Sequence, residues 1–221
     1  NVRNNNPATR SRKVSSLRTF FKYLTNKTNQ LEVNPVLELE TPKLRSALPK
    51  YLTFEQSIDL LARVEGKNKE RDYCILVLFL NCGLRLSELV GLNISDVRQS
   101  SHTIRVLGKG NKERIVYLND ACQDAIKRYL AVRPHDGLID RKALFISGQH
   151  KRISPKTVQY LVKKYLAQID LSGPGYSVHK LRHTAATLMY QHGHVDIRVL
   201  KDILGHENLG TTEIYTHLSD Q

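Results

Sequence analysis

Apolar residues recur at helical spacing close to the start of the chain. They lie opposite several basic side chains, so the pattern predicts an amphipathic helix in the first 30 residues. The apolar stripe consists of Val14, Leu17, Phe20, Phe21 and Leu24. After it, Pro35, Pro42 and Pro49 interrupt helical structure, and we expect an extended interdomain linker at about residues 41 to 50.

A second set of helices is expected after this linker. Thr53 and Gln56 have the spacing of a capping box, so a helix is predicted to begin at about Thr53. The strongly apolar run 73–80 predicts a central core helix, and Gly83 is expected to end it.

One clear sheet signal follows. The β-branched runs 103–107 and 114–118 flank a glycine-rich turn at 108–112, which is typical of an antiparallel hairpin. Further helices are predicted to begin after caps at Asn119, Ser154 and Ser177, to cover 196–204, and to begin again near Thr211 or Thr212. The fold class is therefore expected to be mainly α with a small antiparallel sheet (α+β).

The charge of the chain points to an acidic partner. The 221 residues contain 34 Lys and Arg against 21 Asp and Glu, a net charge of 34 − 21 = +13. Residues 1–31 hold seven basic residues and no acidic one. Such a surface binds polyanions by releasing their counterions, although a solvated helix face is the simpler alternative. The candidate DNA contacts are Arg10, Arg12, Lys13, Arg18, Lys22 and, in the hairpin turn, Lys112.

Several other classes of protein are disfavoured. The longest apolar run has eight residues, where a membrane span needs roughly 20. Three cysteines without C-x-x-C spacing fit a reducing, cytoplasmic compartment. The start at Asn1 lacks the apolar region of a signal peptide and is expected to be the start of a fragment.

Cofactor motifs are also missing. The glycines around Lys109 lack the spacing of a phosphate-binding P-loop, which disfavours ATP binding. His179 and His183 are four residues apart, but Lys180 stands where a zinc protease motif needs Glu. We expect neither a metal nor another cofactor.

Five strings occur in one order along residues 83–217. They are Gly83-Leu84-Arg85-Leu86-Ser87-Glu88-Leu89, Gly108-Lys109-Gly110-Asn111-Lys112-Glu113-Arg114, His179-x-Leu-Arg182-His183, Leu204-Gly205-His206 and Thr212-x-Ile-Tyr215-Thr216-His217. Together they resemble the tyrosine recombinase (phage integrase) family, and its Xer-like members in particular. A weaker resemblance extends back to about Pro7.

The resemblance implies two domains that close around duplex DNA. Residues 1–46 would be the C-terminal part of a helical core-binding domain with its linker, and residues 47–221 a catalytic domain without a C-terminal exchange helix. It also implies a homotetramer acting on two recombination sites, while leaving a monomer open for this chain alone. The expected protein is cytoplasmic and nucleoid-associated.

The residue types suit transesterification at a phosphodiester. Tyr215 is the candidate nucleophile, forming a phosphotyrosyl intermediate that conserves the bond energy. Arg85 and Arg182 are the candidates for the nonbridging oxygens, because a guanidinium donates two parallel hydrogen bonds to phosphate.

The other predicted site residues assist these three. Lys109 is expected to protonate the leaving 5′ oxygen, with Lys112 as its competitor, and His179 to accept or steer the tyrosine proton. The resemblance implies that Glu88 fixes Arg85. His206 is expected to donate to the phosphate, and a supporting role is predicted for His183.

The predicted function is site-specific DNA recombination. A type IB topoisomerase would use similar chemistry to relax supercoils, and a DNA-binding regulator could retain the fold without catalysis. The spacing of the motifs disfavours the first alternative, and the intact set of candidate catalytic residues disfavours the second.

Overall fold

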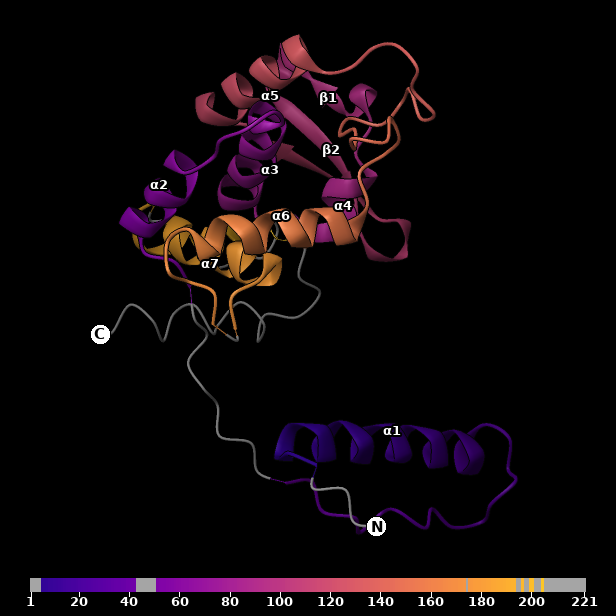
Figure 1. The fold of residues 1–221 in the computed structure, drawn as a ribbon. Helices are drawn as coiled ribbons and strands as arrows, with labels where there is room; N and C mark the ends of the chain where they lie inside the picture. Colours follow the sequence, from indigo (N-terminus) through magenta and orange to yellow (C-terminus); the bar gives the residue numbers. More distant parts are fainter. Residues whose placement is uncertain are drawn as a thin grey trace. The chain divides into compact units, whose positions relative to one another are not determined.

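A computed structural model describes residues 5–42, 51–173 and 175–193, together with residues 196, 199, 200 and 204 (Figure 1). The chain divides into two compact units, Asn1–Leu48 and Pro49–Gln221. The predicted linker lies mostly outside the described residues.

The first unit contains the predicted amphipathic helix, α1 (Pro7–Asn26). Pro7 occupies the first helical position, and the Asn6 side chain accepts a hydrogen bond from the Thr9 amide at 2.8 Å. Arg18 donates to the Leu39 carbonyl at 2.5 Å, which ties the following segment back to the helix. No residue of α1 is buried, and Phe20 is 56% exposed, so the described part of this unit covers the apolar stripe only partly.

The core of the second unit forms around α3 (Lys69–Cys82), which packs between α5 (Asp120–Val132) and α7 (Val178–Gln191), as Figure 1 shows. Ten of its 14 residues are buried, which confirms the predicted core helix. The shorter α2 (Phe54–Ala62) packs beside it, and the capping box predicted at Thr53 and Gln56 is present.

The small sheet has the order β1 (Val97–Arg98), β2 (Thr103–Leu107) and β3 (Glu113–Tyr117), all antiparallel. The hairpin is confirmed, although β3 begins and ends one residue earlier than the apolar run predicts. β1 was not predicted, because two residues are too few to show a strand period. Three short 3-10 helices were missed for the same reason: η1 (Ile94–Asp96), η2 (Gln99–Ser101) and η3 (Lys109–Asn111).

The remaining helices are α4 (Leu86–Gly91) and α6 (Pro155–Ala167). Asn119 and Ser154 cap α5 and α6 with side-chain hydrogen bonds, as predicted. Ser177 occupies the N-cap position of α7 without such a bond. The predicted helix at 196–204 is described only at residues 196, 199, 200 and 204, and the one near Thr211 lies outside the described residues.

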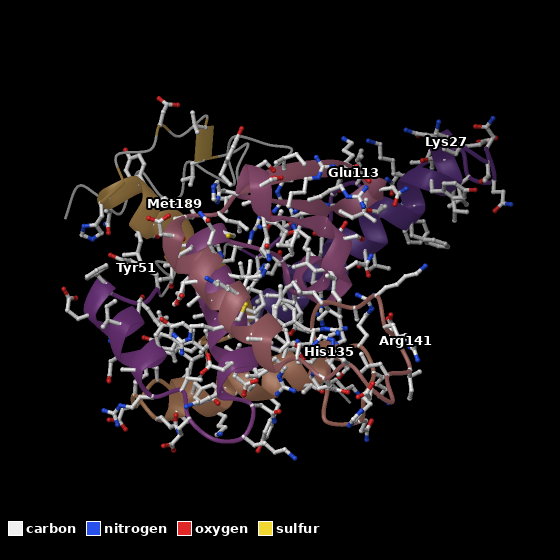
Figure 2. All side chains as sticks on the ribbon, turned by 90° about the horizontal axis from the view of Figure 1, so that it is seen from above. Lys27, Tyr51, Glu113, His135, Arg141 and Met189 are labelled. Atoms are coloured by element: carbon white, nitrogen blue, oxygen red, sulfur yellow. The ribbon has the colours of Figure 1, made fainter. Side chains whose placement is uncertain are left out.

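A long loop between α5 and α6 is organised by one buried arginine. Arg133 is 3% exposed and donates to the carbonyls of Leu144 at 3.1 Å and Ala143 at 2.7 Å, among others. His135 and Arg141 mark this loop in Figure 2. The loop therefore keeps a defined path past the end of α5 without strands or helices of its own.

Two negative findings apply to the described part of the chain. None of its helices has the length and hydrophobicity needed to cross a membrane. Within the same residues, no group of three or more His, Cys, Asp or Glu side chains is placed to hold a metal ion.

Candidate active site

The end of α3 brings the first motif to the site. Gly83 follows the helix in the left-handed region, with φ 56° and ψ 35°. A Cβ atom on Gly83 would lie only 2.7 Å from Cδ2 of Leu204. The left-handed backbone thus favours glycine here, and any Cβ at this position would have to displace the Leu204 side chain. The turn delivers Arg85 to the N-cap position of α4.

A buried carboxylate joins two arginines beside this turn. Oε1 of Glu88 accepts from Nη1 of Arg85 at 2.7 Å and from Nη1 of Arg114 at 2.6 Å. Oε2 accepts from the Arg85 backbone amide at 2.7 Å and from Nη2 of Arg114 at 3.0 Å. The Glu88 side chain is 1% exposed. Glu88 therefore contacts Arg85, the partner proposed from the sequence, and both of its oxygens also accept hydrogen bonds from Arg114.

Arg114 was not predicted as a site residue. The signal was present in strand alternation, because Arg114 lies two residues before the buried Val116 and so shares the inward face of β3. Burial acts to raise the pKa of Glu88, but the hydrogen bonds from Arg114 and the Arg85 backbone outweigh it and lower the pKa. Glu88 is accordingly ionised at neutral pH.

Arg182 is placed by α7 and is 5% exposed. Its Nη1 donates to the Gly83 carbonyl at 2.5 Å and its Nη2 to the Leu204 carbonyl at 2.6 Å. One guanidinium thus joins the end of α3 to the segment that contains Leu204. Gly83 lies two residues before Arg85, so the hydrogen bond to its carbonyl places the Arg182 guanidinium next to the turn that carries Arg85.

The two histidines of α7 lie one turn apart, with ring centroids separated by 5.8 Å and the ring planes at 80°. Burial lowers the pKa of His179, and the positive charges of Arg182 and Lys180 add to the effect. Burial lowers the pKa of His183 to about 4, assisted by Lys180 and His179. Both rings are therefore neutral at pH 7, the state in which His179 can accept a proton.

A cleft of about 390 Å³ brings Arg85 and His179 together. Among the described residues, its lining carries basic and neutral side chains and no carboxylate. The lining residues are Leu84, Arg85, Leu86, Gln159, Lys163, Ser177, Val178 and His179. Gln159 and Lys163 of α6 were not predicted; their exposed positions at i and i+4 on one helix face were the available signal. A cationic cleft of this kind suits a phosphodiester.

The other predicted residues are placed only in part. Tyr215 and His206 lie outside the described residues. The backbone of Lys109 belongs to η3 at the hairpin tip, while its side chain is not described. Lys112 is exposed at the hairpin, and so are the five predicted basic residues of α1, namely Arg10, Arg12, Lys13, Arg18 and Lys22.

Comparison with known proteins agrees with the motifs. Residues 50–221 match the phage integrase family. The chain is 57% identical over 220 residues to a tyrosine recombinase XerC of Caldanaerobacter subterraneus subsp. tengcongensis, a match that covers 100% of this chain and 62% of the relative. It is 39% identical over 218 residues to a tyrosine recombinase XerC of Thermodesulfovibrio yellowstonii, covering 94% of this chain and 70% of the relative.

A solved structure supports the fold. The structure of an XerH site-specific recombinase bound to a palindromic difH substrate, in a post-cleavage complex, has a TM-score of 0.82 at 24% identity. The similarity covers 97% of this chain and 65% of that one, so the chain spans less than two thirds of this protein and of the first XerC relative. The matched family residues, the relatives and the fold agree that the chain belongs to the phage integrase family, the tyrosine recombinases.

Proposed function

We propose that this protein is a site-specific DNA recombinase that cleaves and rejoins strands through a 3′-phosphotyrosyl intermediate. One observation supports this more than any other. Arg85 and a neutral His179 line the same cleft, and no acidic side chain appears among its described lining residues. A phosphodiester carries a negative charge, which a cation such as Arg85 can stabilise. In the proposed reaction a tyrosine hydroxyl attacks the phosphorus and must lose its proton, which a neutral histidine can accept.

The proposed reaction is a transesterification. The oxygen of Tyr215 attacks phosphorus and forms the 3′-phosphotyrosyl bond, while the bond to the 5′ oxygen breaks and that oxygen receives a proton from Lys109. The 5′ hydroxyl of a partner strand then attacks the phosphotyrosine and releases the tyrosine. One phosphoester bond is exchanged for another in each step, so no ATP is consumed.

The contacts of the described residues support the roles that we propose for them. Arg85 and Arg182 stabilise charge on the nonbridging oxygens. Glu88 holds Arg85, and the carbonyls of Gly83 and Leu204 hold Arg182 in a fixed orientation.

Histidines complete the proposed site. His179 accepts or steers the Tyr215 proton, and His206 donates to the same phosphate. His183 contacts His179 edge to face and supports its orientation.

The proposed substrate is a duplex recombination site. The exposed basic residues of α1 and Lys112 would bind the phosphate backbone, which makes binding steeply dependent on salt. We further propose that residues 1–46 belong to a core-binding domain and residues 47–221 to the catalytic domain. Four protomers would act on two sites, within a cytoplasmic, nucleoid-associated complex.

A nicked suicide substrate tests the proposal. Cleavage beside the nick releases a short fragment, so religation stops and the covalent protein–DNA adduct accumulates on a denaturing gel. We expect an adduct with the native chain and none with Tyr215→Phe. Tyr117→Phe is the matched control, since Tyr117 is 81% exposed on β3 and has no role in the proposed chemistry.

Two results would contradict the proposal. An adduct that survives Tyr215→Phe would identify another nucleophile, and relaxation of supercoiled DNA without exchange between two sites would favour a topoisomerase.

A further inference from the structure

The carboxylate of Glu88 is shared between two cations. Arg85 and Arg114 each carry one positive charge and Glu88 one negative charge, so these three described side chains together have a net charge of 2 − 1 = +1. Arg114 bonds to both carboxylate oxygens through its side chain, whereas the side-chain ion pair of Arg85 uses Oε1. The carboxylate is therefore held at both oxygens by Arg114 of β3, and one of these oxygens also pairs with Arg85.

The cluster also lies directly under the hairpin. A Cβ atom on Gly108 would be 3.6 Å from Oε1 of Glu88 and 3.8 Å from Nη1 of Arg114. The Gly108 amide donates to the Lys112 carbonyl at 2.8 Å and closes the turn at this point. Arg114 thus comes from one arm of the hairpin and reaches across to the first turn of α4.

We propose that Arg114 is a positioning residue for the cleavage reaction, acting on Arg85 through Glu88. By holding both oxygens of the carboxylate, it keeps Glu88 from forming a one-to-one ion pair with Arg85. This inference rests on the proposed recombinase function, because the phosphate is the group that Arg85 would bind.

The electrostatic reason is a competition for the Arg85 guanidinium. Without Arg114, Arg85 and Glu88 would form a neutral pair inside a site where charges are weakly screened. The carboxylate would then compete with the incoming phosphate for the same guanidinium. With Arg114 present, the cluster keeps its net positive charge and presents Arg85 from a fixed position.

The first test measures single-turnover cleavage of a suicide substrate at saturating protein. Arg114→Met is expected to slow cleavage by about 10- to 100-fold, less than the roughly 10²- to 10³-fold loss for removing a direct charge-stabilising donor. Arg114→Lys keeps the charge without the two-pronged geometry, so a smaller loss is expected. Arg105→Met is the matched control, because Arg105 lies on the neighbouring strand and pairs with Asp96.

A double variant separates charge from structure. Glu88→Gln combined with Arg114→Met leaves only the charge of Arg85 and restores a net charge of +1. We expect it to cleave at least threefold faster than Arg114→Met alone. If Arg114 merely held the hairpin in place, the double variant would be no faster, and that result would overturn the proposal.

A modified substrate gives a second readout that folding cannot mimic. In a methylphosphonate, a neutral methyl group replaces one nonbridging oxygen, so the demand for positive charge from Arg85 is reduced. The defect of Arg114→Met relative to the native chain should shrink at least threefold on this substrate. An undiminished defect would contradict action through Arg85, even for a variant of reduced stability.

A further substrate tests the alternative route through the hairpin. A bridging 5′ sulfur leaves without protonation, so it bypasses the proposed role of Lys109. We expect the Arg114→Met defect to persist on it, and full rescue would place the effect on the leaving group instead. If the native chain forms no adduct at all, the proposed function fails; if it cleaves and Arg114→Met cleaves equally fast, only this inference fails.

Discussion

Replacing Gly83 with alanine should destabilise the second unit, Pro49–Gln221, through two separable effects. The first is backbone strain, because φ 56° and ψ 35° lie in the left-handed region, which costs an L-residue about 1–2 kcal/mol. Alanine also restricts the unfolded chain, which returns about 0.4–1 kcal/mol. The second effect is steric, since the new Cβ would lie 2.7 Å from Cδ2 of Leu204 and 3.7 Å from Cβ of Ala185.

The steric effect has a matched control in the same chain. Gly110 is also left-handed, with φ 71° and ψ 24°, but a Cβ there would meet nothing within 4 Å. Gly110→Ala should therefore cost about 1 kcal/mol or less. Gly83→Ala should cost about 2–4 kcal/mol, because overpacking a core contact adds roughly 1–3 kcal/mol.

Urea unfolding followed by circular dichroism measures both free energies. The difference between the two variants isolates the contact with Leu204. Because the carbonyls of Gly83 and Leu204 both accept from Arg182, Gly83→Ala should also slow cleavage. Equal losses of stability for Gly83→Ala and Gly110→Ala would refute the reasoning.

Three further predictions concern Arg182, His183 and the three cysteines. Arg182→Lys should lower the cleavage rate by roughly 10²- to 10³-fold, because an ammonium lacks the planar guanidinium that bonds to two carbonyls at once. Cleavage kinetics on a suicide substrate measure this rate, and a loss below threefold would contradict the prediction. His183 should titrate near pH 4 by NMR, because burial lowers its pKa in the folded protein. The stability that it contributes is therefore complete above its pKa in the unfolded chain, about 6.5, and is lost as the pH falls toward 4. A titration near pH 6.5 would contradict its burial. All three cysteines are buried, so a thiol reagent should label none of them in the native protein and all three after unfolding. Rapid labelling of the native protein would instead show that the core around Cys82 and Cys122 opens.

Local signals in the sequence predicted much of the fold. The caps at Thr53, Asn119 and Ser154 and the glycine that ends α3 depend on neighbours within four residues, so their patterns can be read along the chain. β1 could not be predicted in this way, because it has only two residues and forms only by pairing with β2.

The site was harder to predict for the same reason. The contact between Arg114 and Glu88 joins residues 26 positions apart, and the contact between Arg182 and Gly83 joins residues 99 apart. The sequence indicated that Arg85, His179 and Arg182 share a function, but the fold was needed to show which groups hold them. The roles assigned to these three residues, and those assigned to Tyr215, His206 and Lys109, stay predictions.

Identifying the amino acid joined to DNA tests the central claim most directly. The adduct formed on a suicide substrate would be digested with protease and nuclease, and the nucleotide-bearing peptide sequenced by mass spectrometry. We predict a 3′ phosphate esterified to the phenol oxygen of Tyr215. A nucleotide attached to any other side chain, or a 5′-linked adduct, would contradict the account.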